Sequence, residues 1–148
     1  MKKTILLLLA ILFINSVNAQ GEYDSNGLKT GKWRILHKKN HNFHEIGYFE
    51  KGKREGEWKE YFFNKLSQSG QYINGKKNGV WKLYFGSHSE KKNISATGKF
   101  YKGKRDGQWK FYYRKGKIEK IGNYRNGSKI GEWKLYSKEG NLIKTENY

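Results

Sequence analysis

Aromatic and polar residues alternate along short segments of this chain. In residues 109–114, Trp109, Phe111 and Tyr113 alternate with neighbours that include Lys110 and Arg114. Successive side chains of an extended strand point to opposite faces, so this pattern predicts a strand with one aromatic face. Glycine interrupts such segments roughly every five to ten residues, too often for a stable helix. The pattern therefore predicts an all-β protein.

One frame repeats five times: Gly, three residues, Gly, one residue, Trp. The frame uses 10 of the 18 glycines and all five tryptophans. Self-similarity of this kind is typical of arrays in which each small unit packs against its neighbours. The copies are Gly27/Gly31/Trp33, Gly52/Gly56/Trp58, Gly75/Gly79/Trp81, Gly103/Gly107/Trp109 and Gly127/Gly131/Trp133.

A second motif, Gly-x-aromatic, lies between the frames. Its aromatic residue precedes the next Trp by nine residues every time, whereas the distance from a Trp forward to it varies from 14 to 19. A fixed joint requires the same geometry in each copy, and a variable one indicates a solvent-facing loop. Each repeat therefore predicts a β-hairpin, with turns at residues 115–117 and 138–141 and with both frame glycines in a tight reversal between hairpins. The aromatic residues are Phe49, Tyr72, Phe100 and Tyr124.

Stacked hairpins predict one elongated antiparallel sheet of ten or eleven strands, roughly 50 Å long at about 4.8 Å per strand. We expect the tryptophans to form a structural ladder on one face, with the strand glycines 47, 70, 98 and 122 leaving bare backbone beneath neighbouring rings. The last strand, residues 142–148, is then an open edge that could pair with a partner. The ladder residues are Trp33, Trp58, Trp81, Trp109 and Trp133.

The repeats resemble the MORN repeat, best in its bacterial variant form, Gly-x-Tyr-x-x-Gly-Lys-x-x-Gly-x-Trp-x-x-Tyr. Residues 74–84 and 102–112 carry the resemblance most clearly, and it covers nearly the whole chain from Gly21 to Tyr148. It implies a ladder of β-hairpins used for protein–protein contact, assembly or membrane-surface association. Bacterial proteins of this variant are often labelled antitoxin components of toxin–antitoxin modules. The resemblance implies no catalytic residue.

The first 19 residues have the pattern of a secretory signal peptide. Lys2 and Lys3 precede an apolar run, and Ala19 ends a small-residue cleavage site. We expect a repeat domain of five hairpins over residues 20–148, exported to the bacterial periplasm or secreted. Export conflicts with a simple cytoplasmic antitoxin, but an immunity-like protein that blocks a toxin in the periplasm would remove the conflict.

Charge adds a candidate binding surface. The chain has 31 Lys and Arg against 13 Asp and Glu, a net charge of +18, which predicts attraction to anionic partners. A cation follows each Trp, and a Tyr stands two residues later in four copies. Alternatively, the cations have no ligand and only form a solvated face that prevents aggregation through sheet edges. The candidate binding face comprises Arg34, Lys59, Lys82, Lys110, Lys134, Tyr61, Tyr84, Tyr112 and Tyr136. Further cations occupy the fixed joints, at Lys29, Lys53, Arg54, Lys76, Lys77, Lys104, Arg105 and Lys129.

Catalytic and metal sites are poorly supported. The chain has no cysteine, which excludes thiol catalysis and zinc–thiolate sites. His37, His41 and His44 stand near Glu45, but their spacing fits no strand face, so an incidental loop is favoured over a metal site. The two aspartates, Asp24 and Asp106, lie in turn positions of the repeat. We expect no catalytic residue, no cofactor and no metal, and therefore not an enzyme.

The sequence predicts an exported, non-catalytic repeat scaffold that binds a protein partner or an anionic envelope surface of lipid or polysaccharide. The alternative is an antitoxin-like or immunity protein that neutralises a cognate toxin. A metal-dependent hydrolase built on the histidine loop is a third and weaker class. Export makes nucleic acid an unexpected ligand, although basic residues interleaved with aromatics also occur in single-strand binders. Partner identity and oligomeric state are left open.

Overall fold

The computed structural model describes residues 21–37, 42–86 and 93–148. The predicted signal peptide, residues 1–19, lies outside the described residues, as do His41 and the middle of the third hairpin loop. Among the described residues, none forms a helix with the length and hydropathy that a membrane crossing needs.

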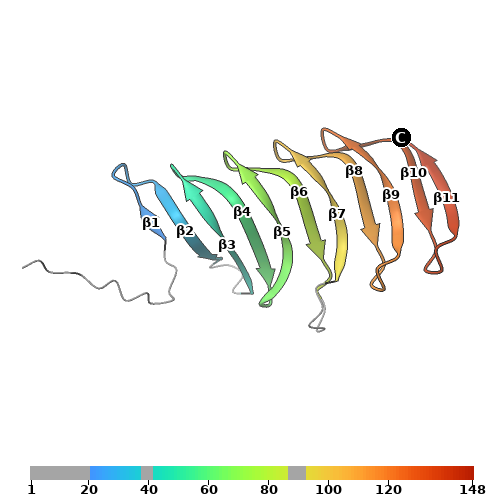
Figure 1. Cartoon of the computed structure of the whole chain (residues 1–148), viewed down its shortest axis with the longest axis horizontal. Helices are drawn as coiled ribbons and strands as arrows, with labels where there is room; N and C mark the ends of the chain where they lie inside the picture. Colours follow the sequence, from blue (N-terminus) through green and yellow to red (C-terminus); the bar gives the residue numbers. More distant parts are fainter. Residues whose placement is uncertain (1–20, 38–41, 87–92) are drawn as a thin grey trace, which may run out of the picture.

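The described chain is all-β and forms one open antiparallel sheet of eleven strands, whose spatial order follows the sequence from β1 to β11. Figure 1 shows the strands side by side in a curved row, with turns along two opposite edges. The predicted fold class, an elongated sheet of consecutive hairpins, is confirmed. The strands are β1 (Glu22–Tyr23), β2 (Lys29–Leu36), β3 (Phe43–Glu50), β4 (Lys53–Phe62), β5 (Lys65–Ile73), β6 (Lys76–Tyr84), β7 (Ile94–Tyr101), β8 (Lys104–Tyr112), β9 (Ile118–Arg125), β10 (Ser128–Tyr136) and β11 (Leu142–Asn147).

The core is a continuous ladder of aromatic rings across the sheet, one ring on each strand from β1 to β10 and a last ring directly after β11. Each Trp makes edge-to-face contacts with the aromatic residue on either side, at centroid distances of 5.1 to 6.2 Å and interplanar angles of 68 to 89°. Such pairs are favoured by the ring quadrupole. We call the face that carries them the ring face. The series is Tyr23, Trp33, Phe49, Trp58, Tyr72, Trp81, Phe100, Trp109, Tyr124, Trp133 and Tyr148.

The strand glycines explain how a single-layer sheet hides tryptophan completely. Trp58, Trp81 and Trp109 are 0% exposed. A Cβ on Gly98 would lie only 2.3 Å from the Trp109 ring, and equivalent overlaps occur in every repeat. The bare backbone therefore lets each indole lie flat on the neighbouring strand. The indole N–H of Trp109 donates to the Lys99 carbonyl at 3.0 Å, so its polar group is satisfied too.

The two glycines of the frame have different roles, which corrects the prediction that both belong to the reversal. Only the first lies in the turn, as in Lys102–Gly103, where φ is 48° and 87°. The second, such as Gly107 with φ of 67°, lies inside the strand. Beside Gly107 the pairing advances one residue on β7 while it advances three on β8, from Lys99↔Asp106 to Gly98↔Trp109. A left-handed glycine permits this bulge, and the bulge brings Trp109 opposite Gly98.

The sheet has two edges of turns, which we name from their role. The joint edge carries the tight turns between β3 and β4, β5 and β6, β7 and β8, and β9 and β10, along the top of Figure 1. The tip edge carries the hairpin ends between β4 and β5, β8 and β9, and β10 and β11. The predicted turns at residues 115–117 and 138–141 are confirmed at this edge, where Tyr113 N–H bonds the Lys117 carbonyl and Ser137 N–H the Asn141 carbonyl, both at 2.8 Å.

Candidate functional site

The cations that follow each Trp lie on the face opposite the rings, because adjacent strand residues point to opposite sides. The register places them in one straight row across ten strands, each separated from the next by a small or β-branched uncharged residue. We call this face the lysine face. In order, the row is Arg34, Ile46, Lys59, Ser69, Lys82, Thr97, Lys110, Ile121, Lys134 and Thr145. One cation every second strand corresponds to a spacing of about 9.6 Å.

The cations of the row differ in their partners. Lys59 and Lys134 pair with exposed glutamates two residues earlier on their own strands, at 3.3 and 3.0 Å. Lys82 and Lys110 form no ion pair with any described residue. Arg34, at the end of the row, likewise forms no ion pair with a described residue, so three of the five cations are available to an external anion and two of them lie in the middle of the lysine face.

The predicted tyrosines flank this row and are half-buried. Tyr61 stacks on His44 with ring centroids 4.7 Å apart and an interplanar angle of 3°. Burial, with the nearby positive charge of Arg34, lowers the pKa of His44. The hydroxyl of Tyr84 lies 3.4 Å from the Ser69 hydroxyl. Tyr61 and Tyr84 thus each contact a residue of a neighbouring strand.

Five joint cations lie on the ring face, a position that the sequence pattern alone does not predict. Each lies 3.9 to 4.8 Å from the centroid of the Trp ring in its own frame. Cations over aromatic faces stabilise by about 0.5–2 kcal/mol, depending on desolvation. These residues therefore have a structural role as covers of the ladder. They are Lys29, Arg54, Lys77, Arg105 and Lys129.

Two carboxylates are buried on the ring face: Glu60, which sequence reasoning missed, and Glu45, which it grouped with the histidines. Glu45 is 4% exposed and pairs with Arg54 Nη2 at 2.5 Å and with His37 Nε2 at 2.8 Å. Glu60 is 6% exposed and accepts a hydrogen bond from Gln68 Nε2. A signal was present: Glu60 stands two residues after Trp58, where the other repeats carry Ile, Leu or Phe.

Lys77 joins the second carboxylate to the ladder. Its Nζ lies 3.3 Å from Glu60 Oε1 and donates to Gln68 Oε1 at 2.9 Å. Burial lowers the pKa of Lys77, and the neighbouring Glu60 opposes that shift. The arrangement neutralises the buried charge of Glu60 within the sheet.

The histidine cluster is divided by the sheet. His37 pairs with Glu45 on the ring face, whereas His44 stacks on Tyr61 on the opposite side. His41 lies outside the described residues. Over the described ranges, no group of three or more His, Asp or Glu side chains has the geometry to hold a metal ion. The first aspartate, Asp24, caps a turn by accepting the N–H groups of Asn26 and Leu28.

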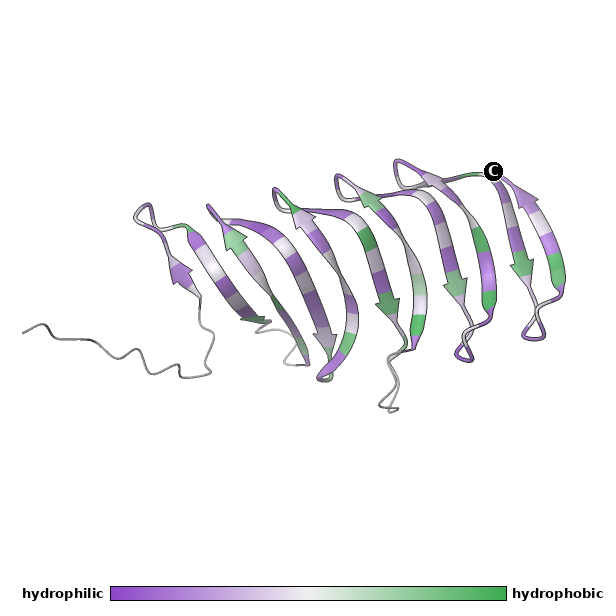
Figure 2. Cartoon of the chain, in the orientation of Figure 1, coloured by the Kyte–Doolittle hydropathy of each residue, from purple (hydrophilic) through white to green (hydrophobic). Residues whose placement is uncertain are grey.

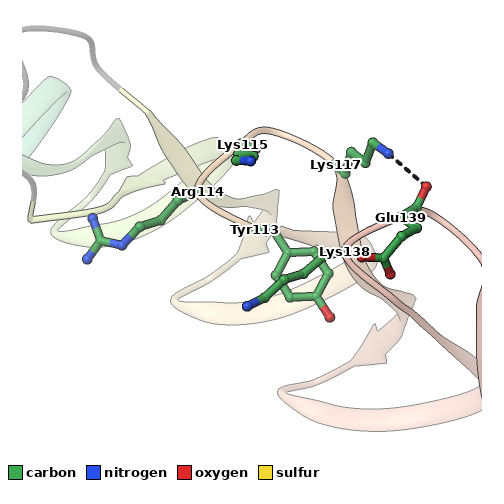
Figure 3. Close-up of a pocket in the computed structure, with 6 residues that line it drawn as sticks. All are labelled: Tyr113, Arg114, Lys115, Lys117, Lys138 and Glu139. Carbon is green, nitrogen blue, oxygen red and sulfur yellow. Dashed lines mark hydrogen bonds between the residues drawn. The ribbon is translucent and has the colours of Figure 1, made fainter.

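A basic pocket of about 610 Å³ lies at the tip edge, between the hairpin ends of β8–β9 and β10–β11. Figure 3 shows its lining residues on the two neighbouring turns. Lys117 Nζ donates to the Glu139 carbonyl at 2.7 Å and so ties the turns together, while Arg114 points away from this contact. The cations therefore do not converge on one point. The lining residues are Tyr113, Arg114, Lys115, Lys117, Lys138 and Glu139.

Comparisons with known proteins assign neither family nor function. No family model and no curated protein matches the chain. Similar solved structures include TarM (16% identity, TM-score 0.35, 73% of this chain and 18% of that one) and a TarM variant from S. aureus with fondaparinux, α-GlcNAc-glycerol and UDP (15% identity, TM-score 0.35, the same coverage). A GtfA/B complex is 8% identical, with a TM-score of 0.33 over 87% of this chain and 20% of that one. The chain thus spans about a fifth of their length.

Proposed function

We propose that this protein is a non-catalytic, exported scaffold whose lysine face binds a protein partner or an anionic surface of the cell envelope. The observation that carries the proposal is the row of five cations in register across the sheet, with no acidic residue among its ten positions. Export rests on the signal-peptide pattern of residues 1–19.

The shape of the sheet supports this function. Figure 2 shows hydrophilic and hydrophobic residues interleaved along the strands, with no strand hydrophobic throughout. The aromatic core lies within one layer, so the opposite face is free to present charge. A rigid row of cations at about 9.6 Å intervals suits an extended anionic partner, because several weak contacts add once the first has formed.

The test reverses charge at the centre of the row. We expect Lys82→Glu with Lys110→Glu to reduce the retained partner about tenfold or more, because these two cations form no ion pair within the described part of the chain. The control is Lys53→Glu with Lys104→Glu, which makes the same charge change at exposed positions of the joint edge. The bait is the tagged chain expressed in its native host. It is incubated, in separate experiments, with envelope extract and with vesicles in which a quarter of the lipid is phosphatidylglycerol. Each experiment is done at low and at high salt.

The outcomes separate the candidate partners. A single protein retained at high salt by the control and lost by the row variant supports a dedicated protein partner. If that protein is toxic and is neutralised on binding, the antitoxin alternative replaces the general scaffold. Retention of lipid or polysaccharide that salt releases supports the anionic surface, since salt screens exposed charges. Equal loss in the row variant and the control contradicts a role specific to the lysine face.

A further inference from the structure

The hairpin end between β4 and β5 has an unusual residue in its turn. Phe63 and Asn64 make a two-residue reversal with φ of 49° and 58°. Four joint turns with the same left-handed conformation place Lys or Asn first and glycine second: Lys51–Gly52, Asn74–Gly75, Lys102–Gly103 and Asn126–Gly127. A bulky aromatic residue is sterically unfavourable in this conformation, whereas Asn tolerates it.

The phenyl rings at this turn are exposed and yet held in place. Phe62 and Phe63 are 46% and 57% exposed, and their centroids lie 4.6 Å apart at an interplanar angle of 80°. The Phe63 N–H donates to the Asn42 carbonyl at 2.7 Å, which ties the turn to the neighbouring hairpin. Phe62 pairs with Phe43 across β3 and β4. Two apolar rings thus project into solvent with a fixed relative geometry.

Stability of the fold does not account for this arrangement. Asn at position 63 would relieve the turn, and the ring of Phe63 remains largely in water. Unfavourable backbone geometry kept at an exposed position is characteristic of sites that contact another molecule. Aromatic residues fixed before binding lose little entropy on association and are common among the residues that dominate interface energies.

We propose that Phe62 and Phe63 form a docking finger that enters an apolar pocket on an acidic protein partner. This inference rests on the proposed binding function and names the class of partner and the anchor. The acidic character follows from charge complementarity, because the chain carries a net +18 and Lys65 pairs directly with Phe62 beside the rings.

A protein pocket fits these observations better than a bilayer or a second copy of the chain. A bilayer has no fixed shape, so it gains nothing from a preorganised ring pair. The other two described tips, residues 114–117 and 137–141, carry charged, polar or glycine residues and no apolar side chain that could enter hydrocarbon. A second copy would bring together two chains of like charge.

The experiment uses Phe63→Asn, which removes one ring while placing a residue suited to the left-handed turn. The matched control is Tyr101→Asn, which removes an aromatic ring 54% exposed at the joint edge. The wild-type chain and both variants are tagged and expressed in the native host. The envelope proteins that each chain retains in a pull-down are then compared. Any protein depleted by Phe63→Asn is then purified, and its affinity for all three chains is measured by calorimetry. Thermal unfolding checks each chain.

We expect Phe63→Asn to weaken binding of the purified protein about tenfold or more, with an unfolding temperature equal to or above wild type, while Tyr101→Asn binds as wild type does. Unchanged affinity in Phe63→Asn overturns the docking finger, as does retention of anionic vesicles alone or ring-dependent self-association. If Lys82→Glu with Lys110→Glu loses the partner and Phe63→Asn keeps it, the finger is wrong and the lysine-face function stands. Loss of the partner through Phe63→Asn alone supports the finger and moves the binding surface from the lysine face to the tip edge.

Discussion

Two segments of the ring face share one aromatic ladder but differ in the row of residues beside it. From β3 to β5 this row reads Glu45, Glu60 and Gln68, and we call it the ionic segment. From β6 to β8 it reads Leu83, Ala96 and Phe111, the apolar segment. The strand register places both sets of residues at equivalent positions of the repeat. The same backbone conformation therefore accommodates either buried carboxylates or an apolar layer.

The difference shows which role of the joint cations is constant. Arg54, in the ionic segment, and Arg105, in the apolar one, lie 4.6 and 4.5 Å from their Trp centroids. Each donates to a tyrosine hydroxyl at 3.1 Å, Arg54 to Tyr72 and Arg105 to Tyr124. Only Arg54 also pairs with a carboxylate among the described residues. Covering the ring is therefore the general function of this position, and ion pairing is added where a glutamate is buried.

The largest expected effect tests whether the ladder is equivalent in both segments. We expect Gly70→Ala and Gly98→Ala each to destabilise the fold by about 3 kcal/mol, because the new Cβ would lie 2.4 and 2.3 Å from the indole of Trp81 or Trp109. Chemical denaturation measures both free energies of unfolding. Gly86→Ala is the control, since a Cβ there meets nothing within 4 Å. Clearly unequal costs at 70 and 98 would show that the adjacent row also supports the ladder.

The next effect comes from converting the ionic segment into the apolar kind. Glu60→Leu leaves the Lys77 ammonium without its carboxylate, and we expect a loss of about 1–3 kcal/mol. Adding Lys77→Met removes the unpaired charge and should recover much of that loss, because well-packed apolar residues can replace a buried ion pair at little cost. A double-mutant cycle from denaturation curves measures the coupling. Additive losses would mean that Glu60 and Lys77 stabilise the fold independently.

Much of this architecture could be predicted from glycine and tryptophan spacing alone. The hairpins, the ladder and the strand glycines under the rings follow from residues that repeat in register, such as Gly98 and Trp109. The role of the second frame glycine could not be derived from the sequence, because the residues around Gly107 are compatible with either a turn or a β-bulge. Its two-residue shift of register is a property of the paired strands.

The candidate site was predictable only in part. Alternation places Lys82 and Lys110 on one face, and the structure aligns them in a row. The burial of Glu45 and Glu60 depends on partners from neighbouring strands, Arg54 and Lys77, and the sequence pattern alone does not show that these side chains meet the carboxylates. The conformation of Phe63 depends on the two-residue length of its turn. The sequence does not give this length, because the spacing on this side of the repeat varies from copy to copy.

A smaller effect concerns the pH dependence of the N-terminal hairpins. Burial lowers the pKa of His44 below its ordinary 6.5, so the unfolded chain takes up a proton first as the pH falls. This contribution to stability is present above pH 6.5 and is lost on acidification below it. We expect His44→Ile, which introduces the residue found at the equivalent places beside Tyr84 and Tyr112, to reduce the loss of unfolding free energy between pH 7 and 5. If the variant's free energy of unfolding changes with pH as the wild type's does, other groups cause the pH dependence.

The smallest effect compares the joint turns of the two segments. Lys51 and Lys102 occupy the first left-handed position of their turns, with φ of 47° and 48°, where two other joints carry Asn. Asn is preferred there because its short polar side chain tolerates this conformation. We expect Lys51→Asn and Lys102→Asn each to raise the free energy of unfolding by about 0.5 kcal/mol, measured from the denaturation midpoint at constant slope. Because both turns lie at the joint edge, away from the row that distinguishes the segments, the gains should be equal. A gain only at position 51 would show that the buried charges of the ionic segment reach the backbone of the neighbouring turn.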